Sequence, residues 1–154
     1  MNLNTQQATL EYYNKFPTVL KDALISGKVR FPDSLQCEYK EMAVFRGVKY
    51  TEDKTEIDRS DFLSHVERRN NNPMFPADDT KISSYSCSFF MNMGVMRQLT
   101  KFPSKNKAIA KGIIRSDFGP IDVNEETSHT DLFLFNNVDP SSEFEVVEKW
   151  EKNG

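Results

Sequence analysis

The stretch Met42-Ala43-Val44-Phe45-Arg46-Gly47-Val48-Lys49-Tyr50 decides the fold class. Neighbouring residues of a β-strand point to opposite faces, so Val44, Arg46 and Val48 would share one face, while Phe45 and Gly47 would share the other. An arginine among apolar neighbours is a polar group that needs partners when it is buried. We therefore predict a strand here, with an arginine held on its apolar face.

The chain before this strand is predicted to be a helical lead-in over residues 1–30. Thr5 is a candidate N-cap for a helix that runs to Lys15. Pro17 suits the first turn of a second helix, which Gly27 would end.

The chain after this strand is predicted to alternate between short helices and strands. We expect helices over Ser60–Arg69 and Phe89–Phe102, with a loop over residues 70–80 after the first of them. The expected strands are Lys81–Ser88, Lys107–Arg115, Asp131–Phe135 and Phe144–Glu148, with a turn at Phe118-Gly119-Pro120. No repeat or linker divides the sequence, so residues 1–154 are predicted to form one α+β domain with its core over residues 42–148.

Composition and charge exclude several classes of protein. A chain of 154 residues that is 38% hydrophobic can bury a core, and its net charge of -3 argues against a general nucleic-acid binder. The start of the chain lacks the pattern of a secretory signal, and no apolar run approaches the length of a membrane span. Cys37 and Cys87 are expected to be reduced thiols. We therefore expect a soluble, cytoplasmic protein with neither nucleic acid nor membrane as partner.

Glu143-Phe144-Glu145 places two carboxylates on one face of the last predicted strand. Like charges at this spacing repel, so the presence of both carboxylates on one face requires an explanation. One reading is a charged edge strand that discourages aggregation. The other is a pair of carboxylates in a site.

Other candidate site residues lie upstream of this pair. The guanidinium of Arg46 can bind phosphate in a bidentate manner, and the small Gly47 lets a ligand come close. Ser86 and Ser88 offer hydroxyl groups at the end of a strand. His129-Thr130-Asp131 could place an imidazole and a carboxylate on one face, but a third metal ligand is not indicated. A serine hydrolase is disfavoured because no nucleophile-elbow motif is present.

Together these motifs resemble the arginine-serine-glutamate class of ADP-ribosyltransferases. That family has an aromatic-Arg-Gly strand, a Ser-Thr-Ser strand that leads into a helix, and a Glu-x-Glu strand, in this order. Here the matches are Phe45-Arg46-Gly47, Ser86-Cys87-Ser88 and Glu143-Phe144-Glu145, with Cys87 in place of the threonine. The resemblance implies a small split or curved β-sheet preceded by helices.

The resemblance also implies a reaction and a role for each matched residue. NAD would be the substrate, and its ADP-ribose would pass to a protein side chain, which the Glu-x-Glu form suggests is arginine. Arg46, Gly47, Ser86 and Ser88 would bind NAD, with Arg46 on the phosphates. Glu145 would stabilise the charge that develops as nicotinamide leaves, and Glu143 would orient the acceptor.

Two other functions are compatible with the same sequence. One is a protein-binding module without enzymatic activity, because the chain is rich in aromatic residues that anchor interfaces. The other is a module that binds nucleotides without reaction. The target protein and the oligomeric state are left open.

Overall fold

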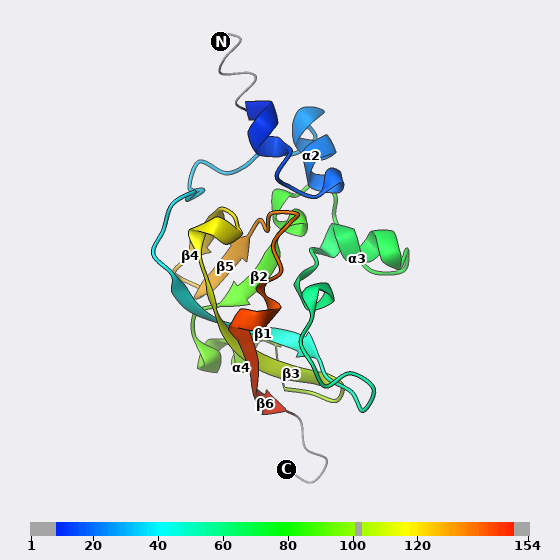
Figure 1. The fold of residues 1–154 in the computed structure, drawn as a ribbon, viewed down its shortest axis with the longest axis vertical. Coiled ribbons are helices and arrows are strands. Elements are labelled where there is room, and N and C mark those ends of the chain that lie inside the picture. Colours follow the sequence, from blue (N-terminus) through cyan, green and yellow to red (C-terminus); the bar gives the residue numbers. More distant parts are fainter. Residues whose placement is uncertain (1–8, 101–102, 150–154) are drawn as a thin grey trace.

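The computed structural model describes residues 9–100 and 103–149, which form an α+β domain with the N-terminal helices at one end of a sheet and α4 towards the other (Figure 1). Residues 9–13 are helical. The further helices are α2 (Thr18–Ile25), α3 (His65–Asn71) and α4 (Met93–Thr100). The strands are β1 (Met42–Lys49), β2 (Cys87–Phe90), β3 (Lys107–Ile114), β4 (Ile121–Asn124), β5 (His129–Leu132) and β6 (Phe144–Lys149).

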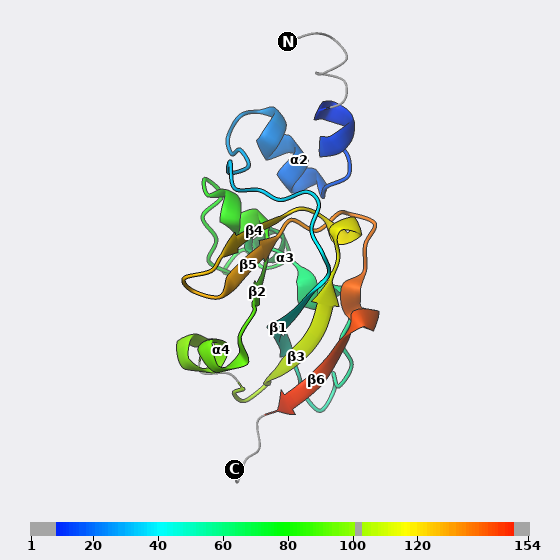
Figure 2. The same cartoon turned by 90° about the vertical axis from the view of Figure 1, so that its left-hand side faces the viewer.

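The described strands form one antiparallel sheet in the order β4-β5-β2-β1-β3-β6. In one half, β1 pairs with β3 from Met42 to Lys49, and β3 pairs with β6. In the other half, the four-residue strands β2, β5 and β4 pair along their length. The halves meet at a single residue pair, Phe45 opposite Phe90. We call this junction the seam; Figure 2 shows the two groups of strands on either side of it.

An aromatic stack fills the core next to the seam. The ring of Phe62 lies 6.3 Å from that of Phe89 and 5.0 Å from that of Phe144. Gly112 makes room for this packing, because a Cβ atom there would lie 2.4 Å from the Phe144 ring. The rings therefore tie β2, β6 and the segment before α3 together by apolar burial.

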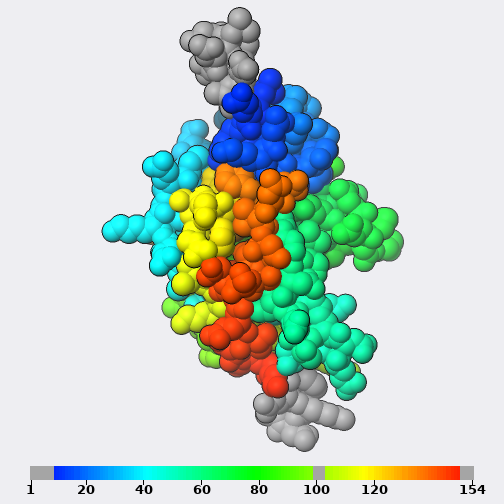
Figure 3. Space-filling view, in the orientation of Figure 1, coloured from blue at the N-terminus to red at the C-terminus, as the bar shows by residue number. Residues whose placement is uncertain are grey.

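The helical lead-in covers one end of the sheet and has its own core. Phe16 and Leu20 are buried against Phe133, and the backbone N–H of Asn136 donates to the carbonyl of Lys15. Figure 3 shows this N-terminal part resting on the chain that follows β5. It is thus a packing layer continuous with the domain.

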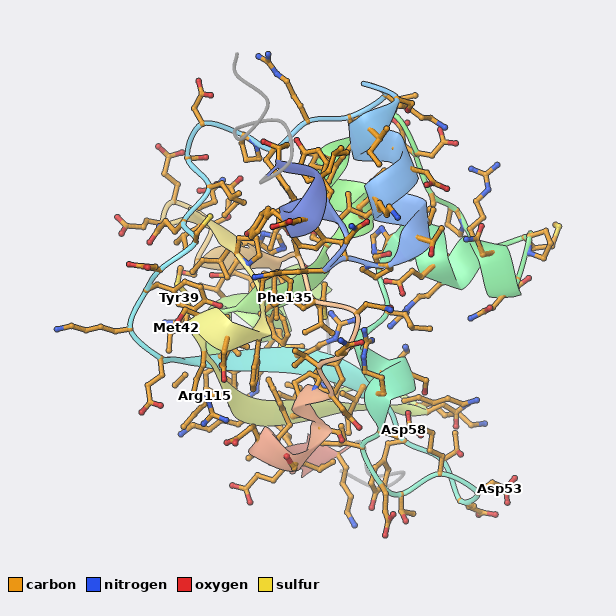
Figure 4. The ribbon with its side chains drawn as sticks, turned by 45° about the horizontal axis from the view of Figure 1, so that its top comes forward. Tyr39, Met42, Asp53, Asp58, Arg115 and Phe135 are labelled. Carbon is orange, nitrogen blue, oxygen red and sulfur yellow. The ribbon has the colours of Figure 1, made fainter. Side chains whose placement is uncertain are left out.

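The segment between α2 and β1 descends along the edge of the sheet at β4. A backbone bridge pairs Gln36 with Ile121. The hydroxyl of Tyr39 then donates to the carbonyl of Arg115, 2.7 Å away, and lies 2.8 Å from that of Gly119. Figure 4 shows Tyr39, Met42 and Arg115 gathered at one end of β1, while Asp53 and Asp58 lie in the loop at its other end.

The predicted strands Met42–Tyr50, Lys107–Arg115 and Phe144–Glu148 and the second helix are confirmed within one or two residues. The proposed cap Thr5 lies outside the described residues. Both described cysteines are free, with Cys37 exposed and Cys87 buried. In the described part of the chain, no helix is long and apolar enough to cross a membrane.

Four predicted elements are wrong in their boundaries. The predicted strand Lys81–Ser88 is mostly a 3₁₀ turn over Ile82–Tyr85, where the hydroxyl of Ser86 donates to the carbonyl of Ser83 and so competes with strand pairing. Phe89 and Phe90 belong to β2, so the following helix starts only at Met93, where Asn92 accepts from the N–H of Val95.

The predicted helix Ser60–Arg69 is interrupted because two capping boxes lie within it. Asp58 caps a 3₁₀ turn over Arg59–Phe62, and Ser64 with Glu67 caps α3. The predicted strand Asp131–Phe135 starts and ends too late, since β5 covers His129–Leu132, and its hairpin partner β4 is not among the predicted strands.

Candidate functional site

Arg46 fastens the two halves of the sheet at the seam. Its Nε donates to the carbonyl of Asp61 at 2.8 Å, and its Nη1 donates to the carbonyl of Ser88 on β2 at 2.5 Å. The guanidinium also lies over the rings of Phe62 and Phe89, with its central carbon 6.0 and 5.5 Å from their centroids. Only 8% of Arg46 is exposed. The arginine that the sequence placed on an apolar face thus finds backbone carbonyls as its partners.

A cavity of about 240 Å³ opens beside this guanidinium. We call it the cationic cavity. Its walls come from β1, α3, β2, α4 and the start of β3, so the fold assembles it from segments far apart in the sequence. The lining residues are Arg46, Gly47, His65, Arg68, Ser88, Phe90, Met96 and Lys107.

Positive charge is concentrated in this cavity. Burial, and then the repulsion from Arg46, lowers the pKa of Arg68. Burial, Arg68 and Arg46 likewise lower the pKa of Lys107 and of His65 below their usual values. These shifts share one cause, since cations placed together out of water disfavour one another's charged forms.

No ion pair relieves this repulsion among the described residues. Neither Arg46, Arg68 nor Lys107 forms a salt bridge with a described carboxylate. The nearby Asp61 carboxylate is bound by Lys54 at 2.6 Å and accepts the backbone N–H of Asp58 at 3.0 Å. An anion bound in the cavity would therefore be attracted by positive charge that Asp61 offsets only in part, and oxyanions such as phosphate suit these donors.

A hydroxyl, an imidazole and a carboxylate lie together on the neighbouring strands β2 and β5. They are on the face of the sheet that carries Phe45 and Phe90, opposite to the side chain of Arg46, and of these residues only Ser88 lines the cavity. Ser88 on β2 faces Asp131 on β5, and the hydroxyl of Ser88 is hydrogen-bonded to Nε2 of His129. The same nitrogen lies 3.6 Å from the Asp131 carboxylate. Burial raises the pKa of Asp131, although His129 and the hydroxyl of Ser86 oppose the increase.

This arrangement differs from a serine-protease triad. There the carboxylate binds one ring nitrogen and the serine the other. Here Ser88 and Asp131 both approach Nε2 of His129, so the imidazole cannot relay a proton between them. These residues instead place the partly buried carboxylate of Asp131 next to the side chains of Ser88 and His129.

The predicted carboxylates Glu143 and Glu145 lie elsewhere. Register places Glu145 beside Lys111 and Phe45, whereas Arg46 lies beside Ala110. Residues opposite each other share a face and neighbours in one strand do not, so Glu145 and Arg46 point to opposite faces. The sequence expectation that these two residues line one cleft is therefore not met.

Glu143 is the last residue of a 3₁₀ turn rather than part of the strand, and it accepts a hydrogen bond from Arg115 at 2.7 Å. Glu145 is exposed. Both line a separate hollow of about 290 Å³ together with Lys111 and Gly112. Glu143 is thus held by Arg115, whereas Glu145 lies exposed on the edge strand β6.

Of the four residues predicted to bind NAD, three line the cationic cavity: Arg46, Gly47 and Ser88. Ser86 is buried behind them, and its hydroxyl donates to the carbonyl of Ser83 at 2.7 Å. Sequence reasoning missed the other cations, which are single residues on different elements. For Asp131 the sequence did contain an indication, because its spacing from His129 predicts that the two side chains share one face of a strand.

No family model matches the chain, and neither a curated protein nor a solved structure matches it. Within the described ranges, no group of three His, Cys, Asp or Glu residues could hold a metal ion.

Replacing Arg46 with methionine is expected to lower the free energy of unfolding by about 2–4 kcal/mol. The substitution leaves the carbonyls of Asp61 and Ser88 without their donor at the seam. Urea denaturation followed by circular dichroism measures the change. Arg30→Met, at an exposed position, is the control and should change stability by about 0.5 kcal/mol or less. Equal stability of Arg46→Met and the unmodified protein would contradict the fastening role.

Sulfate is expected to bind the cationic cavity several-fold more tightly at about pH 5.5 than at about pH 7.5. The lowered pKa keeps His65 neutral near pH 7, and a bound dianion favours its protonated form, so binding takes up a proton. Affinity therefore rises as the pH falls through the pKa of His65. Isothermal titration calorimetry measures it.

His65→Gln is the control for this pH dependence. The variant keeps the other cations and should bind sulfate with nearly constant affinity over the same range. An unchanged pH dependence in the variant would show that another group carries it.

Proposed function

We propose that the protein binds NAD with its diphosphate in the cationic cavity and transfers ADP-ribose from it. The observation that carries this proposal is the meeting of Arg46, Gly47 and Ser88 with Arg68 and Lys107 around one cavity. The first three are positions where the sequence resembles ADP-ribosyltransferases. The other two add the charge that a diphosphate needs.

Arg68 and Lys107 would make most of the direct contact with the diphosphate. Arg46 is nearly buried, and two of its nitrogens are already bound to carbonyls. Its charge still acts across the cavity, as its effect on the pKa of both neighbours indicates. Arg46 would thus fix the shape and potential of the site while the other two bind the ligand.

Asp131 is the carboxylate that we assign to the chemistry, in place of Glu145. Both carboxylates lie on the face of the sheet opposite to the side chain of Arg46, but Asp131 is half-buried and pairs with Ser88, which lines the cavity, whereas Glu145 is exposed on another strand. As the bond between C1′ of the ribose and nicotinamide breaks, the electron pair leaves with nicotinamide and positive charge develops on the ribose. A carboxylate aimed at this centre stabilises it.

The nucleophile that attacks C1′ must lose a proton, and His129 is the base placed next to Asp131. Glu143 and Glu145, whose Glu-x-Glu pattern suggested arginine as the acceptor, line a separate hollow. The proposal therefore names a protein side chain as acceptor without a preference for arginine.

Asp131→Asn is expected to reduce the release of nicotinamide from NAD by about 100-fold or more, because it removes the charge that stabilises the transition state. Release is measured by chromatography of the reaction mixture. Glu145→Gln is the matched control, since it neutralises a carboxylate of the last strand, and it should change the rate by about twofold at most.

Two outcomes would contradict the assignment. Loss of activity in Glu145→Gln with an active Asp131→Asn would return the chemistry to the last strand. Tight binding of ADP-ribose by the unmodified protein without any nicotinamide release, with or without added acceptor proteins, would favour a nucleotide-binding module instead of an enzyme.

A further inference from the structure

The cationic cavity is too small for a whole dinucleotide. Its volume is about 240 Å³, whereas pockets that enclose small organic ligands typically measure roughly 300–1,000 Å³. A ligand whose phosphates occupy the cavity must therefore extend beyond it, over a neighbouring surface.

A larger hollow of about 690 Å³ adjoins the cavity. The two share His65, whose imidazole lines both. The far wall of the hollow is the segment over residues 73–78, which follows α3, and its floor includes Ser84. We call it the Phe75 hollow.

Phe75 connects this hollow to the cations. Its ring lies 5.7 Å from the ring of His65, and the guanidinium carbon of Arg68 lies 5.6 Å from its centroid. Phe75 also lines the hollow, and the neighbouring Met74 is 88% exposed. An aromatic ring beside a phosphate site, on an apolar surface open to solvent, suits the stacking of a nucleobase.

Ser84 contributes a hydroxyl group to the hollow. The residue lines the hollow and is only 7% exposed. A hydroxyl group can both donate and accept a hydrogen bond, so it can bind a ribose hydroxyl or a base edge in the hollow.

The wall of the hollow is held in place before any ligand binds. Nη1 of Arg69 donates to the carbonyl of Ala77 at 2.8 Å, and the N–H of Phe75 donates to the carbonyl of Asn72 at 2.9 Å. The N–H of Met74 is 3.2 Å from the side-chain oxygen of Asn72. A surface anchored in this way loses little conformational entropy when a ligand binds to it.

We infer that the Phe75 hollow is the nucleoside subsite of this protein. The base of the phosphorylated ligand stacks on Phe75, Ser84 binds its ribose or base, and the phosphates lie in the cationic cavity. This inference rests on the proposed function for the position of the phosphates. It is independent of whether nicotinamide is then released.

The test compares ADP-ribose with inorganic pyrophosphate, which carries the phosphates alone. By calorimetry, the unmodified protein should bind ADP-ribose at least about tenfold more tightly than pyrophosphate. Phe75→Leu should weaken ADP-ribose binding about tenfold and leave pyrophosphate binding within about twofold. Ser84→Ala should weaken ADP-ribose alone, by about threefold to tenfold. Phe135→Leu, which alters a ring in a different hollow, is the control and should change neither affinity.

Equal affinities of the unmodified protein for the two ligands would overturn the nucleoside subsite but would still support phosphate binding in the cationic cavity. Equal losses for both ligands in Phe75→Leu would also overturn it, because Phe75 would then act only by positioning Arg68 and His65. If neither ligand binds the unmodified protein, the proposed function and the subsite both fail.

Discussion

The guanidinium of Arg46 is the interaction on which the rest of the structure depends. The two halves of the sheet share a single residue pair, and the hydrogen bonds from Arg46 to the carbonyls of Asp61 and Ser88 reinforce this junction. A longer β1–β2 pairing would close the gap by ordinary ladder hydrogen bonds. Because a side chain does this instead, the strands can diverge and leave a cavity beside a buried cation.

The cations gathered in that cavity lower the stability of the folded state. Arg68, Lys107 and His65 all have lowered pKa values, which means that each charged form is disfavoured where it stands. Groups that destabilise one another in the free protein are often retained because a ligand compensates them. The acidic net charge of the chain makes this local excess of positive charge more distinctive.

Much of the sheet could be predicted because β1, β3 and β6 are long enough to show alternation of apolar residues. β4 could not, since four residues such as Ile121–Asn124 carry too little periodicity. The predicted strand starts too early because its serines resemble a polar strand, whereas the hydroxyl of Ser86 binds the carbonyl of Ser83 in a local turn. These errors are all local in origin.

The candidate site was predictable only in part, for a different reason. Arg46, Gly47 and Ser88 lie in short motifs, and they do line one cavity. Arg68 and Lys107 come from α3 and β3, and only the tertiary fold brings them together. The position of Glu145 depends on the register between β3 and β6, which contains an irregularity between Ile109 and Ala110. Sequence spacing on one strand cannot reveal register on another.

We propose above all that phosphate groups bind in the cationic cavity next to the seam. Titration of the ¹⁵N-labelled protein with inorganic pyrophosphate, followed by two-dimensional NMR, tests it most directly. The largest shifts should fall on the amides of Gly47, Arg68, Ser88 and Lys107, around the cationic cavity. Shifts confined to residues 111–113 and 142–145, around Glu143 and Glu145, would contradict the account, as would the absence of any saturable shift.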